Sequence, residues 1–368
     1  MAENNGKAIS PTSAGIIAQP ALSADIGLFQ RAFRVILRER NNEMRYYADY
    51  LALFTPQPTG KNMTPDPYQV FDRKQTADLL PFKPLVEALR QAVADYTAGR
   101  ILSPERMVVP LNNKGVMLSM PAVAPDLAIH KLVNVVPDNR QLGLPTLHGQ
   151  VAVFDAQNGV PLFVLDGPEV TGRRTAAVSM LGIIALLPEP PREILLIGSG
   201  TQSRYHLLAI AALYPACRVW VRGTSAARAQ AFCDELRPLH GDLHPCVSDA
   251  IPDNVSVVIT LTTSQRPVYN AAARAGLLII GVGAFKPEMA EIGAVTLSGS
   301  DIYLDDPDGA RHEAGDLIQA NIDWRATFSL AQGLTAPPES TRPIVFKTVG
   351  TAAWDLAAGR VAKQRLGK

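Results

Sequence analysis

The chain has 368 residues, which is long for one domain and sufficient for two, so a large buried core is possible. Its formal net charge of +1 and the lack of any long run of like charge give no electrostatic reason to expect a nucleic acid or an anionic membrane as partner. Three cysteines without CxxC spacing, Cys217, Cys233 and Cys246, argue against a disulfide framework or a structural zinc site and predict a reducing, cytoplasmic compartment. We expect no signal peptide and no membrane-spanning segment.

The first 62 residues differ from the rest of the chain. Residues 1–23 are small and polar, as in a disordered segment, and apolar residues at helical spacing then predict an amphipathic helix over roughly 25–50. Acidic residues in that helix argue against a transit peptide. We interpret residues 1–62 as an N-terminal extension, disordered or forming one amphipathic helix, before a domain that starts at residue 63.

Residues 63–187 predict a domain that mixes helix and sheet. A helix with one apolar face begins near Pro81 and ends at Gly99. Short β-rich runs follow at 107–110, 116–120, 128–136 and 150–155, and Asn158-Gly159 predicts a hairpin turn into a strand over 160–165. A long apolar helix over 171–187 then leads to the next segment.

The segment from Ile194 to Leu207 predicts a strand, a tight turn and a helix. Gly198 and Gly200 fit the first two glycines of a dinucleotide fingerprint, in which the backbone approaches a pyrophosphate at a helix N-terminus. Ser203 stands where a third glycine is usual, and its small size still permits close packing. We expect cofactor contacts from Gly198, Gly200, Thr201, Gln202 and Ser203; the alternative is a purely structural turn.

Strands and helices alternate beyond this turn. We expect strands over 218–221, 244–247, 255–260, 277–282 and 301–304, and helices over 225–236 and 268–275. This order predicts an α/β fold class, with a doubly wound, Rossmann-type nucleotide domain over 188–325. A helix over 351–363 lies too far on to extend that sheet, so we expect residues 326–368 to pack back on residues 63–187.

The end of the second nucleotide-domain strand indicates which cofactor is bound. A site that prefers NAD(H) usually has Asp or Glu there, to bind the ribose 2′-hydroxyl. This chain instead reads Val221-Arg222-Gly223-Thr224, in which Arg222 and Thr224 can donate hydrogen bonds to a 2′-phosphate. The pattern favours NADPH, with NADH as a less preferred possibility. The alternative is that Arg222 is a solvated cation at a strand end.

Several ordered motifs then carry a family resemblance. They are Gly198-x-Gly200-x-Gln202-x-x-x-His206-Leu207, Met120-Pro121-Ala122, Lys131-Leu132-Val133-Asn134, Arg174-Thr175-Ala176-Ala177 and Phe346-Lys347-Thr348-Val349-Gly350. Over about 66–365 the chain resembles the ornithine cyclodeaminase/mu-crystallin family. The resemblance implies a homodimer, with the Rossmann-type domain inserted into a discontinuous α+β domain, 63–187 and 326–368, that supplies the substrate pocket and the dimer sheet.

The resemblance also implies a small amino or imino acid as ligand. Its carboxylate would be bound beside the nicotinamide by Arg106, Lys131 and Arg174, of which Lys131 and Arg174 are the expected catalytic pair. Thr260, Thr262 and Thr263 follow the fourth strand, where family members line the nicotinamide side of the cofactor site; the alternative is a polar strand end satisfied within its own turn. We expect cofactor contacts from Thr260, Thr262 and Val282. No metal is expected.

Two positions discriminate between the chemistries of the family. Ornithine cyclodeaminases carry an aspartate after the fifth nucleotide-domain strand and a glutamate before the Met-Pro pair, and these positions hold Phe285 and Leu118 here. Because neither side chain can act as a base, we predict NADPH-dependent reduction of the cyclic ketimines Δ1-pyrroline-2-carboxylate and Δ1-piperideine-2-carboxylate to L-proline and L-pipecolate. The alternatives are an NAD-dependent, ammonia-releasing ornithine cyclodeaminase, an alanine-type dehydrogenase, and a non-catalytic crystallin-like NADPH-binding protein.

Other polar residues receive structural interpretations. His206 is expected to pack or cap within its helix, and His130 to face away from Lys131 by strand alternation. Asp305 and Asp306 are expected to lie in a loop at a strand end, while Lys286 is a candidate for the mouth of the pocket. The proton donor to the imine nitrogen is left unassigned.

Overall fold

Two β-sheets organise the described part of the chain. A computed structural model describes residues 68–112, 115–248, 250–338 and 342–368, which form one sheet of six strands and one of eight. The expected N-terminal extension, with its helix over 25–50, lies outside the described residues. The α/β fold class is confirmed.

The first sheet is built largely from hairpins. Its strand order is β1-β6-β5-β4-β3-β2, and all neighbours are antiparallel except β1 and β6. The strands are β1 (Gln69–Val70), β2 (Met107–Pro110), β3 (Val116–Val123), β4 (Ala128–Val135), β5 (Leu147–Phe154) and β6 (Pro161–Asp166), with a 3-10 turn over Pro137–Leu142. The sequence predicted β2 to β6 within a few residues of these bounds because their β-branched residues are separated by clear turns.

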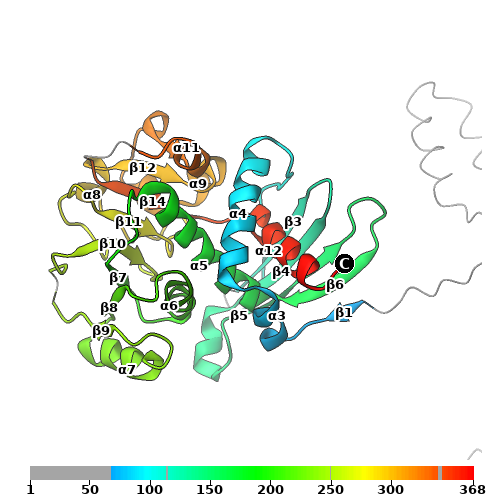
Figure 1. Ribbon diagram of the computed structural model, residues 1–368, viewed down its shortest axis with the longest axis horizontal. Helices are drawn as coiled ribbons and strands as arrows, with labels where there is room; N and C mark the ends of the chain where they lie inside the picture. Colours follow the sequence, from blue (N-terminus) through cyan, green and yellow to red (C-terminus); the bar gives the residue numbers. More distant parts are fainter. Residues whose placement is uncertain (1–67, 113–114, 249, 339–341) are drawn as a thin grey trace, which may run out of the picture. The chain divides into compact units, whose positions relative to one another are not determined.

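Helices cover one face of this sheet. Figure 1 shows α4 (Phe82–Thr97) and α12 (Ala352–Arg365) side by side on it, with α3 (Arg73–Leu79) at one end. Helix α4 buries a stripe at helical spacing, Leu85, Leu89 and Val93, as its amphipathic pattern predicted. Helix α12 is buried almost all round, which fits its many alanines and its place between α4 and the strands.

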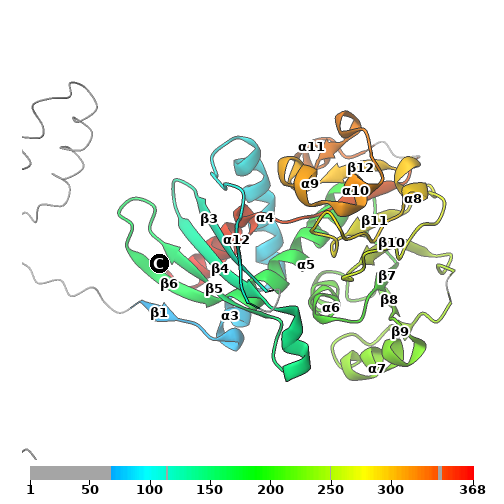
Figure 2. The ribbon, with the colours of Figure 1, turned by 180° about the vertical axis from the view of Figure 1, so that it is seen from behind.

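The other face of the first sheet carries no helix among the described residues. Figure 2 views it directly, with α4 and α12 behind the strands. Strand β4 alternates between buried and half-buried residues, so Leu132 lies on this open face while Lys131 and Val133 point toward the helices. His130 also lies on the open face, where its Nε2 is 2.8 Å from the Ser119 hydroxyl.

The second sheet is parallel throughout. Its order is β13-β12-β14-β11-β10-β7-β8-β9, and its strands are β7 (Glu193–Ile197), β8 (Arg218–Arg222), β9 (Leu243–Pro245), β10 (Val255–Thr260), β11 (Leu278–Gly281), β12 (Asp301–Leu304), β13 (Phe328–Ser329) and β14 (Ile344–Lys347). Its helices are α6 (Thr201–Leu213), α7 (Ala226–Leu236), α8 (Ala294–Ser298), α9 (Pro307–Glu313), α10 (Gly315–Gln319) and α11 (Leu330–Thr335), with a 3-10 turn over Trp324–Ala326.

Two expectations about this sheet need correction. The sheet does not end at residue 325, because β14 pairs with both β11 and β12. All four β14 residues are buried, so this short strand lacks the alternation that marks a strand in sequence. The helix expected over 268–275 is absent: Val268 and Tyr269 donate their amides to the Glu291 carbonyl, which holds that segment extended.

Helix α5 (Gly167–Leu186) joins the two sheets. It begins before residue 171, where we expected it, because Asp166 accepts a hydrogen bond from the Glu169 amide and caps the first turn. Most of its residues are buried, and one apolar core includes it together with Leu85 of α4 and Phe346 of β14. Residues on the two sheets can therefore meet around this helix.

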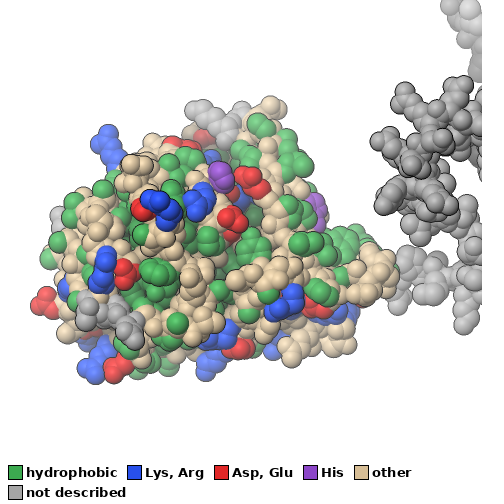
Figure 3. Space-filling view, turned by 90° about the horizontal axis from the view of Figure 1, so that it is seen from above, with side chains coloured by type: hydrophobic (Ala, Val, Ile, Leu, Met, Phe, Trp, Pro, Cys, Tyr) green, Lys and Arg blue, Asp and Glu red, His purple; other side chains and the backbone are tan. Residues whose placement is uncertain are grey.

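The charged side chains on the surface agree with the small net charge of the sequence. The face in Figure 3 bears acidic and basic side chains interspersed, with no field of one sign. No helix among the described residues is long and apolar enough to cross a membrane. In the same part of the chain, no group of three or more His, Cys, Asp or Glu side chains could hold a metal ion.

Candidate active site

The glycine turn lies between β7 and α6. Gly198 has a φ of +123°, and a Cβ on it would come within 2.7 Å of the Leu261 carbonyl oxygen, so only glycine fits there. Gly200 is the N-cap of α6 and supplies no side-chain cap, and a Cβ on it would point into open space. Ser203 donates its hydroxyl to the Gly198 carbonyl at 2.9 Å and closes the turn.

This geometry fits a bound dinucleotide. The first turn of α6, from Thr201 to Ser203, presents backbone amides at a helix N-terminus without a capping side chain. Free amides and the helix dipole favour a pyrophosphate at that position. Gln202 also has a buried Oε1 atom without a hydrogen-bond partner in the described part of the chain. Gly198, Gly200 and the α6 amides are thus the groups that would hold the pyrophosphate.

The end of β8 lies next to the glycine turn. The Gly198 amide donates to the Arg222 carbonyl at 2.8 Å, which brings the two segments together. The Arg222 guanidinium donates to the Ala250 carbonyl at 3.2 Å, so it lies against the loop that follows β9. Thr224 is exposed, and Ser225 caps α7 by accepting from the Arg228 amide. Arg222 therefore lies beside the glycine turn, and Thr224 follows it in the loop before α7.

Thr260 and Thr262 meet a buried glutamate that the sequence reading missed. Glu291 is fully buried; its Oε2 accepts from the Thr260 hydroxyl at 2.9 Å and from the Gly283 amide at 2.6 Å. Its Oε1 accepts from the amide and the hydroxyl of Thr262, at 2.5 and 2.8 Å. Burial raises the pKa of Glu291, while nearby Lys347 opposes that shift.

This arrangement changes how we interpret the two threonines. Thr260 is fully buried, and the hydroxyls of Thr260 and Thr262 both donate to Glu291. The two threonines therefore stabilise the end of β10 through hydrogen bonds within the protein. Val282 follows β11 and donates its amide to the Thr260 carbonyl at 3.1 Å. These strand ends lie at the edge of the sheet that carries the glycine turn, because carboxyl ends of parallel strands share one edge.

Lys131 and Arg174 converge on one buried carboxylate. Asp355 of α12 lies with its Oδ2 at 2.5 Å from Lys131 Nζ and its Oδ1 at 3.2 Å from Arg174 Nε. All three side chains are at least nine-tenths buried. Burial lowers the pKa of Lys131 to about 8; Asp355 opposes this shift, and Arg174 and Arg106 add to it. The electrostatic influence of both arginines on Lys131 places the three predicted cations in one neighbourhood.

Arg106 reaches the same neighbourhood from the loop before β2. Its Nε lies 2.8 Å from Glu313 Oε1, and its Nη2 donates to the Gly350 carbonyl at 2.7 Å. Gly350 has a φ of +78°, and a Cβ on it would come within 2.5 Å of Arg174 Nη1. The backbone of Gly350 therefore contacts both arginines, Arg106 through its carbonyl and Arg174 through the side where a Cβ would lie.

Glu313 is one of the acids that line this site. Its pKa is raised to about 7, mainly by burial; Asp306, Asp305 and Glu105 contribute to the increase and Arg106 opposes it. Its Oε1 pairs with Arg106, but its Oε2 has no hydrogen-bond partner among the described residues. A carboxyl group with one free oxygen and this pKa can donate a proton at neutral pH.

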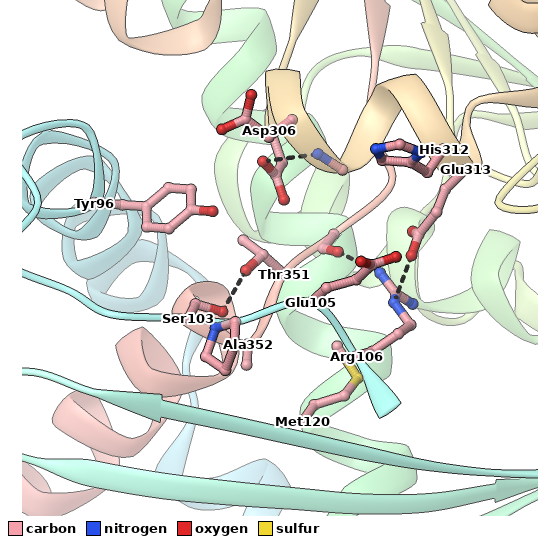
Figure 4. Close-up of a pocket in the computed structure, with 14 residues that line it drawn as sticks. Tyr96, Ser103, Glu105, Arg106, Met120, Asp306, His312, Glu313, Thr351 and Ala352 are labelled. Carbon is pink, nitrogen blue, oxygen red and sulfur yellow. Dashed lines mark hydrogen bonds and ion pairs between the residues drawn. The ribbon is translucent and has the colours of Figure 1, made fainter. Parts of the chain in front are cut away.

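A cavity of about 300 Å³ opens beside Arg106 and Glu313. Figure 4 shows these two side chains meeting at one side of the cavity, with Tyr96 at the opposite side and Asp306 above. The walls come from both sheets and from the connection between them: Tyr96, Ser103–Arg106, Met120, Asp306, Asp308, Gly309, His312, Glu313 and Gly350–Ala352. This volume is sufficient for a small cyclic acid.

Asp305 holds the turn on which Arg106 rests. Its Oδ1 accepts from the Val349 amide at 2.9 Å, and its Oδ2 accepts from the Gly350 amide at 3.0 Å and from Trp354 Nε1 at 3.1 Å. Asp306 caps α9 by accepting from the Gly309 amide. The expectation that this Asp pair lies in a strand-end loop is confirmed.

The remaining candidates lie outside the reaction space. His206 is fully buried, with its Nδ1 2.8 Å from the Gln202 carbonyl and its Nε2 2.9 Å from the Ser179 hydroxyl, and burial lowers its pKa to about 4. It is a packing histidine, as expected. Lys286 is exposed and does not line the cavity.

Comparison with known proteins identifies the family. Residues 69–368, most of the chain, match the ornithine cyclodeaminase/mu-crystallin family. The chain belongs to this family. The resemblance drawn from the ordered motifs is thereby confirmed.

Relatives within the ornithine cyclodeaminase/mu-crystallin family extend over nearly the same length. The Δ1-pyrroline-2-carboxylate/Δ1-piperideine-2-carboxylate reductase of Azospirillum brasilense is 56% identical over 300 residues, which cover 82% of this chain and 96% of that protein. Δ1-Pyrroline-2-carboxylate reductase 1 of Burkholderia multivorans is 57% identical over 297 residues, covering 81% and 96%.

A solved structure shares the fold. Thermococcus litoralis Δ1-pyrroline-2-carboxylate reductase in complex with NADH and L-proline superposes with a TM-score of 0.74 at 23% identity, covering 81% of this chain and 98% of that one. The Rossmann-type sheet and the mixed sheet of the present chain are the shared architecture.

Phe285 and Leu118 occupy the positions where we expected acids in an ornithine cyclodeaminase. Phe285 is half-buried in the loop after β11, and Leu118 is half-buried in β3 and packs on the main core. The acids that the structure does bring to the cavity are Glu105, Asp306, Asp308 and Glu313. The sequence analysis did not identify Glu313 or Asp355 as site residues: Asp355 is a charged residue among apolar neighbours in α12, and Glu313 follows Arg311 and His312 in a polar helix.

Proposed function

We propose that this protein reduces cyclic ketimines with a nicotinamide cofactor, converting Δ1-pyrroline-2-carboxylate to L-proline and Δ1-piperideine-2-carboxylate to L-pipecolate. The observation that carries the proposal is a small cavity lined by Arg106 and Glu313, with two further cations, Arg174 and Lys131, buried behind its wall at Gly350. The reductase that is 56% identical to this chain is named for both ketimines, and the one that is 57% identical is named for Δ1-pyrroline-2-carboxylate; these relatives support the proposed substrates.

The cations bind the substrate carboxylate. Lys131 Nζ and the free edge of the Arg174 guanidinium provide charge-assisted donors in a buried setting, where such hydrogen bonds are strongest. Arg106 adds a third positive charge beside the cavity. Fixing the carboxylate fixes the adjacent C2 atom, which is the carbon that accepts hydride.

Glu313 supplies the proton. When bound, the reduced nicotinamide supplies the hydride to C2. The protonated Glu313 carboxyl gives its proton from Oε2 to the imine nitrogen, which raises the electrophilicity of C2 and leaves a neutral ring amine after reduction. The resulting Glu313 carboxylate stays paired with Arg106, at 2.8 Å, until solvent returns the proton.

NADPH is the proposed cofactor, and NADH the less preferred one. No carboxylate stands between Val221 and Ser225 to bind a ribose 2′-hydroxyl, while Arg222 and Thr224 offer donors for a 2′-phosphate. Figure 1 places β8, which ends at Arg222, beside β7, which leads into the glycine turn.

A homodimer in the cytoplasm is the proposed form. The open face of the first sheet carries half-buried apolar residues such as Met117, Leu132 and Val164, which a second copy would cover. An alanine dehydrogenase of the same fold is a dimer. All three cysteines are free and buried, in keeping with a reducing compartment.

Substitution of the carboxylate-binding cations tests the proposal. We expect Lys131→Met and Arg174→Met each to lower kcat/KM for Δ1-pyrroline-2-carboxylate by roughly 100-fold or more, since each removes a charge-assisted hydrogen bond from a buried carboxylate. NADPH affinity should stay at the wild-type value. Unchanged kcat/KM in both variants would reject this assignment of the site.

A further inference from the structure

Asp355 occupies a central place among the charged residues of the site without lining the cavity. It is fully buried in α12, and it meets Lys131 from β4 and Arg174 from α5. Three elements distant in sequence thus bring one carboxylate and two cations together inside the core. Burying three charges costs free energy unless each has a partner, so the arrangement calls for a functional reason.

Each oxygen of the Asp355 carboxylate contacts one of the two cations. Asp355 Oδ2 lies 2.5 Å from Lys131 Nζ, while Oδ1 accepts from Arg174 Nε at 3.2 Å. Nε is the Arg174 atom that donates to Asp355, which leaves the two terminal nitrogens available for another acceptor. They lie beside Gly350, and no described residue accepts a hydrogen bond from them. The terminal edge of a guanidinium matches a carboxylate in a bidentate pair.

The charges also match a single anion. Lys131 and Arg174 carry two positive charges and Asp355 one negative charge, so the trio retains one net positive charge for one substrate carboxylate. Without Asp355, two adjacent buried cations would repel one another, and Lys131 would release its proton more readily. Burial already lowers the pKa of Lys131 to about 8, Arg174 and Arg106 lower it as well, and Asp355 is the group that opposes them.

We propose that Asp355 is a positioning residue that fixes Lys131 and turns the terminal edge of Arg174 toward the substrate carboxylate. This inference rests on the proposed function, because it assigns the same two cations to the carboxylate. Asp355 acts through Lys131 and Arg174 and touches neither the substrate nor the cofactor. The chemical class that the trio selects is a small acid with one carboxylate next to the reacting carbon.

Asp355→Asn is the variant that tests this role. The amide keeps the shape of the side chain but removes its charge and replaces one acceptor by a donor. We expect KM for Δ1-pyrroline-2-carboxylate to rise about 30-fold or more, with a smaller change in kcat and an unchanged Kd for NADPH. The pH at which ketimine affinity is lost should also move below 8, because Lys131 loses the carboxylate that keeps it protonated.

Asp95→Asn is the matched control. Asp95 is a buried carboxylate of α4 that pairs with Arg360 of α12 at 2.8 Å and with Arg100 at 2.9 Å. It therefore stabilises α12, the helix that carries Asp355, but at a position that does not line the cavity. Its substitution should lower Tm while leaving KM and its pH profile at the wild-type values. A KM and a pH profile in Asp355→Asn equal to those of wild type would overturn the inference.

A second variant covers the case in which Asp355→Asn does not fold. Arg174→Lys keeps the charge but cannot donate to Asp355 and present a bidentate edge at once, so KM should again rise about 30-fold or more. A wild-type KM in Arg174→Lys would overturn the inference.

Binding of pyrrole-2-carboxylate, a planar acid that cannot accept hydride, separates this inference from the proposed function. Calorimetry should show weaker binding to Asp355→Asn, or to Arg174→Lys, than to wild type, even if wild type fails to reduce either ketimine. In that outcome the proposed reaction fails and the role of Asp355 stands. Equal binding to wild type and variant, or no binding to wild type, overturns the role.

Discussion

Arg106 Nε lies 2.8 Å from Glu313 Oε1, and the second oxygen of Glu313 has no hydrogen-bond partner among the described residues. The pair joins the loop before β2 to helix α9, and the cavity opens beside it. Because Arg106 holds one oxygen, the other is the atom from which a proton can leave. This geometry supports the proposal that Glu313 is the proton donor, which the sequence left open.

Replacement of Glu313 by Gln removes that proton. We expect kcat/KM for the ketimine to fall roughly 10²- to 10⁴-fold at neutral pH, which is the usual contribution of general acid catalysis. The deficit should shrink at lower pH, where solvent protonates the imine. Steady-state assays over a pH series check this, and Glu105→Gln, which lies in the cavity wall without pairing with Arg106, is the comparison. A Glu313→Gln variant with wild-type kcat/KM would assign the proton to another donor.

The pH profile of the wild-type enzyme should have two steps on its alkaline side. Burial raises the pKa of Glu313 to about 7, so its proton is present below that pH and is lost above it. Burial lowers the pKa of Lys131 to about 8, so its charge is lost at higher pH still. Log kcat/KM should decline above about 7 and more steeply above about 8. Activity that stays level up to pH 9 would contradict both assignments.

Gly198→Ala should damage the cofactor site and the fold together. The residue has a φ of +123°, and the new methyl group would come within 2.7 Å of the Leu261 carbonyl oxygen. We expect a loss of at least about 1–3 kcal/mol in the free energy of unfolding from backbone strain alone, and weaker NADPH binding. Gly99→Ala is the control, since its φ is +68° but no atom lies within 4 Å. It should lower stability without changing the Kd for NADPH.

Arg222→Ala tests the choice between the two cofactors. Removing a charged donor to a 2′-phosphate should raise KM for NADPH roughly 10- to 100-fold and leave KM for NADH nearly unchanged. Arg218→Ala, on the same strand and paired with Asp242 at 3.2 Å, should change neither value. Equal effects of Arg222→Ala on both cofactors would show that Arg222 only anchors the loop at Ala250.

Local patterns were sufficient to predict most of the architecture. Alternation in β4, the apolar face of α4 and the glycine turn before α6 are encoded in neighbouring residues, and they appear within a few residues of their expected bounds. Strand β14 was missed because a short strand buried on both faces shows no period. The segment 268–275 looked helical, but its backbone pairs with the chain near Glu291 instead.

Some residues of the candidate site could be predicted from the sequence and others could not. Arg106, Lys131 and Arg174 came from motif resemblance, and the structure brings them into one neighbourhood. Asp355, Glu313 and Glu291 could not be found, because their importance depends on partners that only the tertiary fold supplies. A buried carboxylate in a helix looks the same in sequence whether it meets a catalytic lysine or a structural arginine.

Oxidation of NADPH by the purified protein in the presence of Δ1-pyrroline-2-carboxylate, with the product identified by chiral chromatography, tests the central claim most directly. The account predicts one L-proline formed for each NADPH consumed, and L-pipecolate from the six-membered ketimine. L-Ornithine without any ketimine should yield no ammonia. Ammonia release from L-ornithine, or tight NADPH binding with no oxidation by either ketimine, would contradict it.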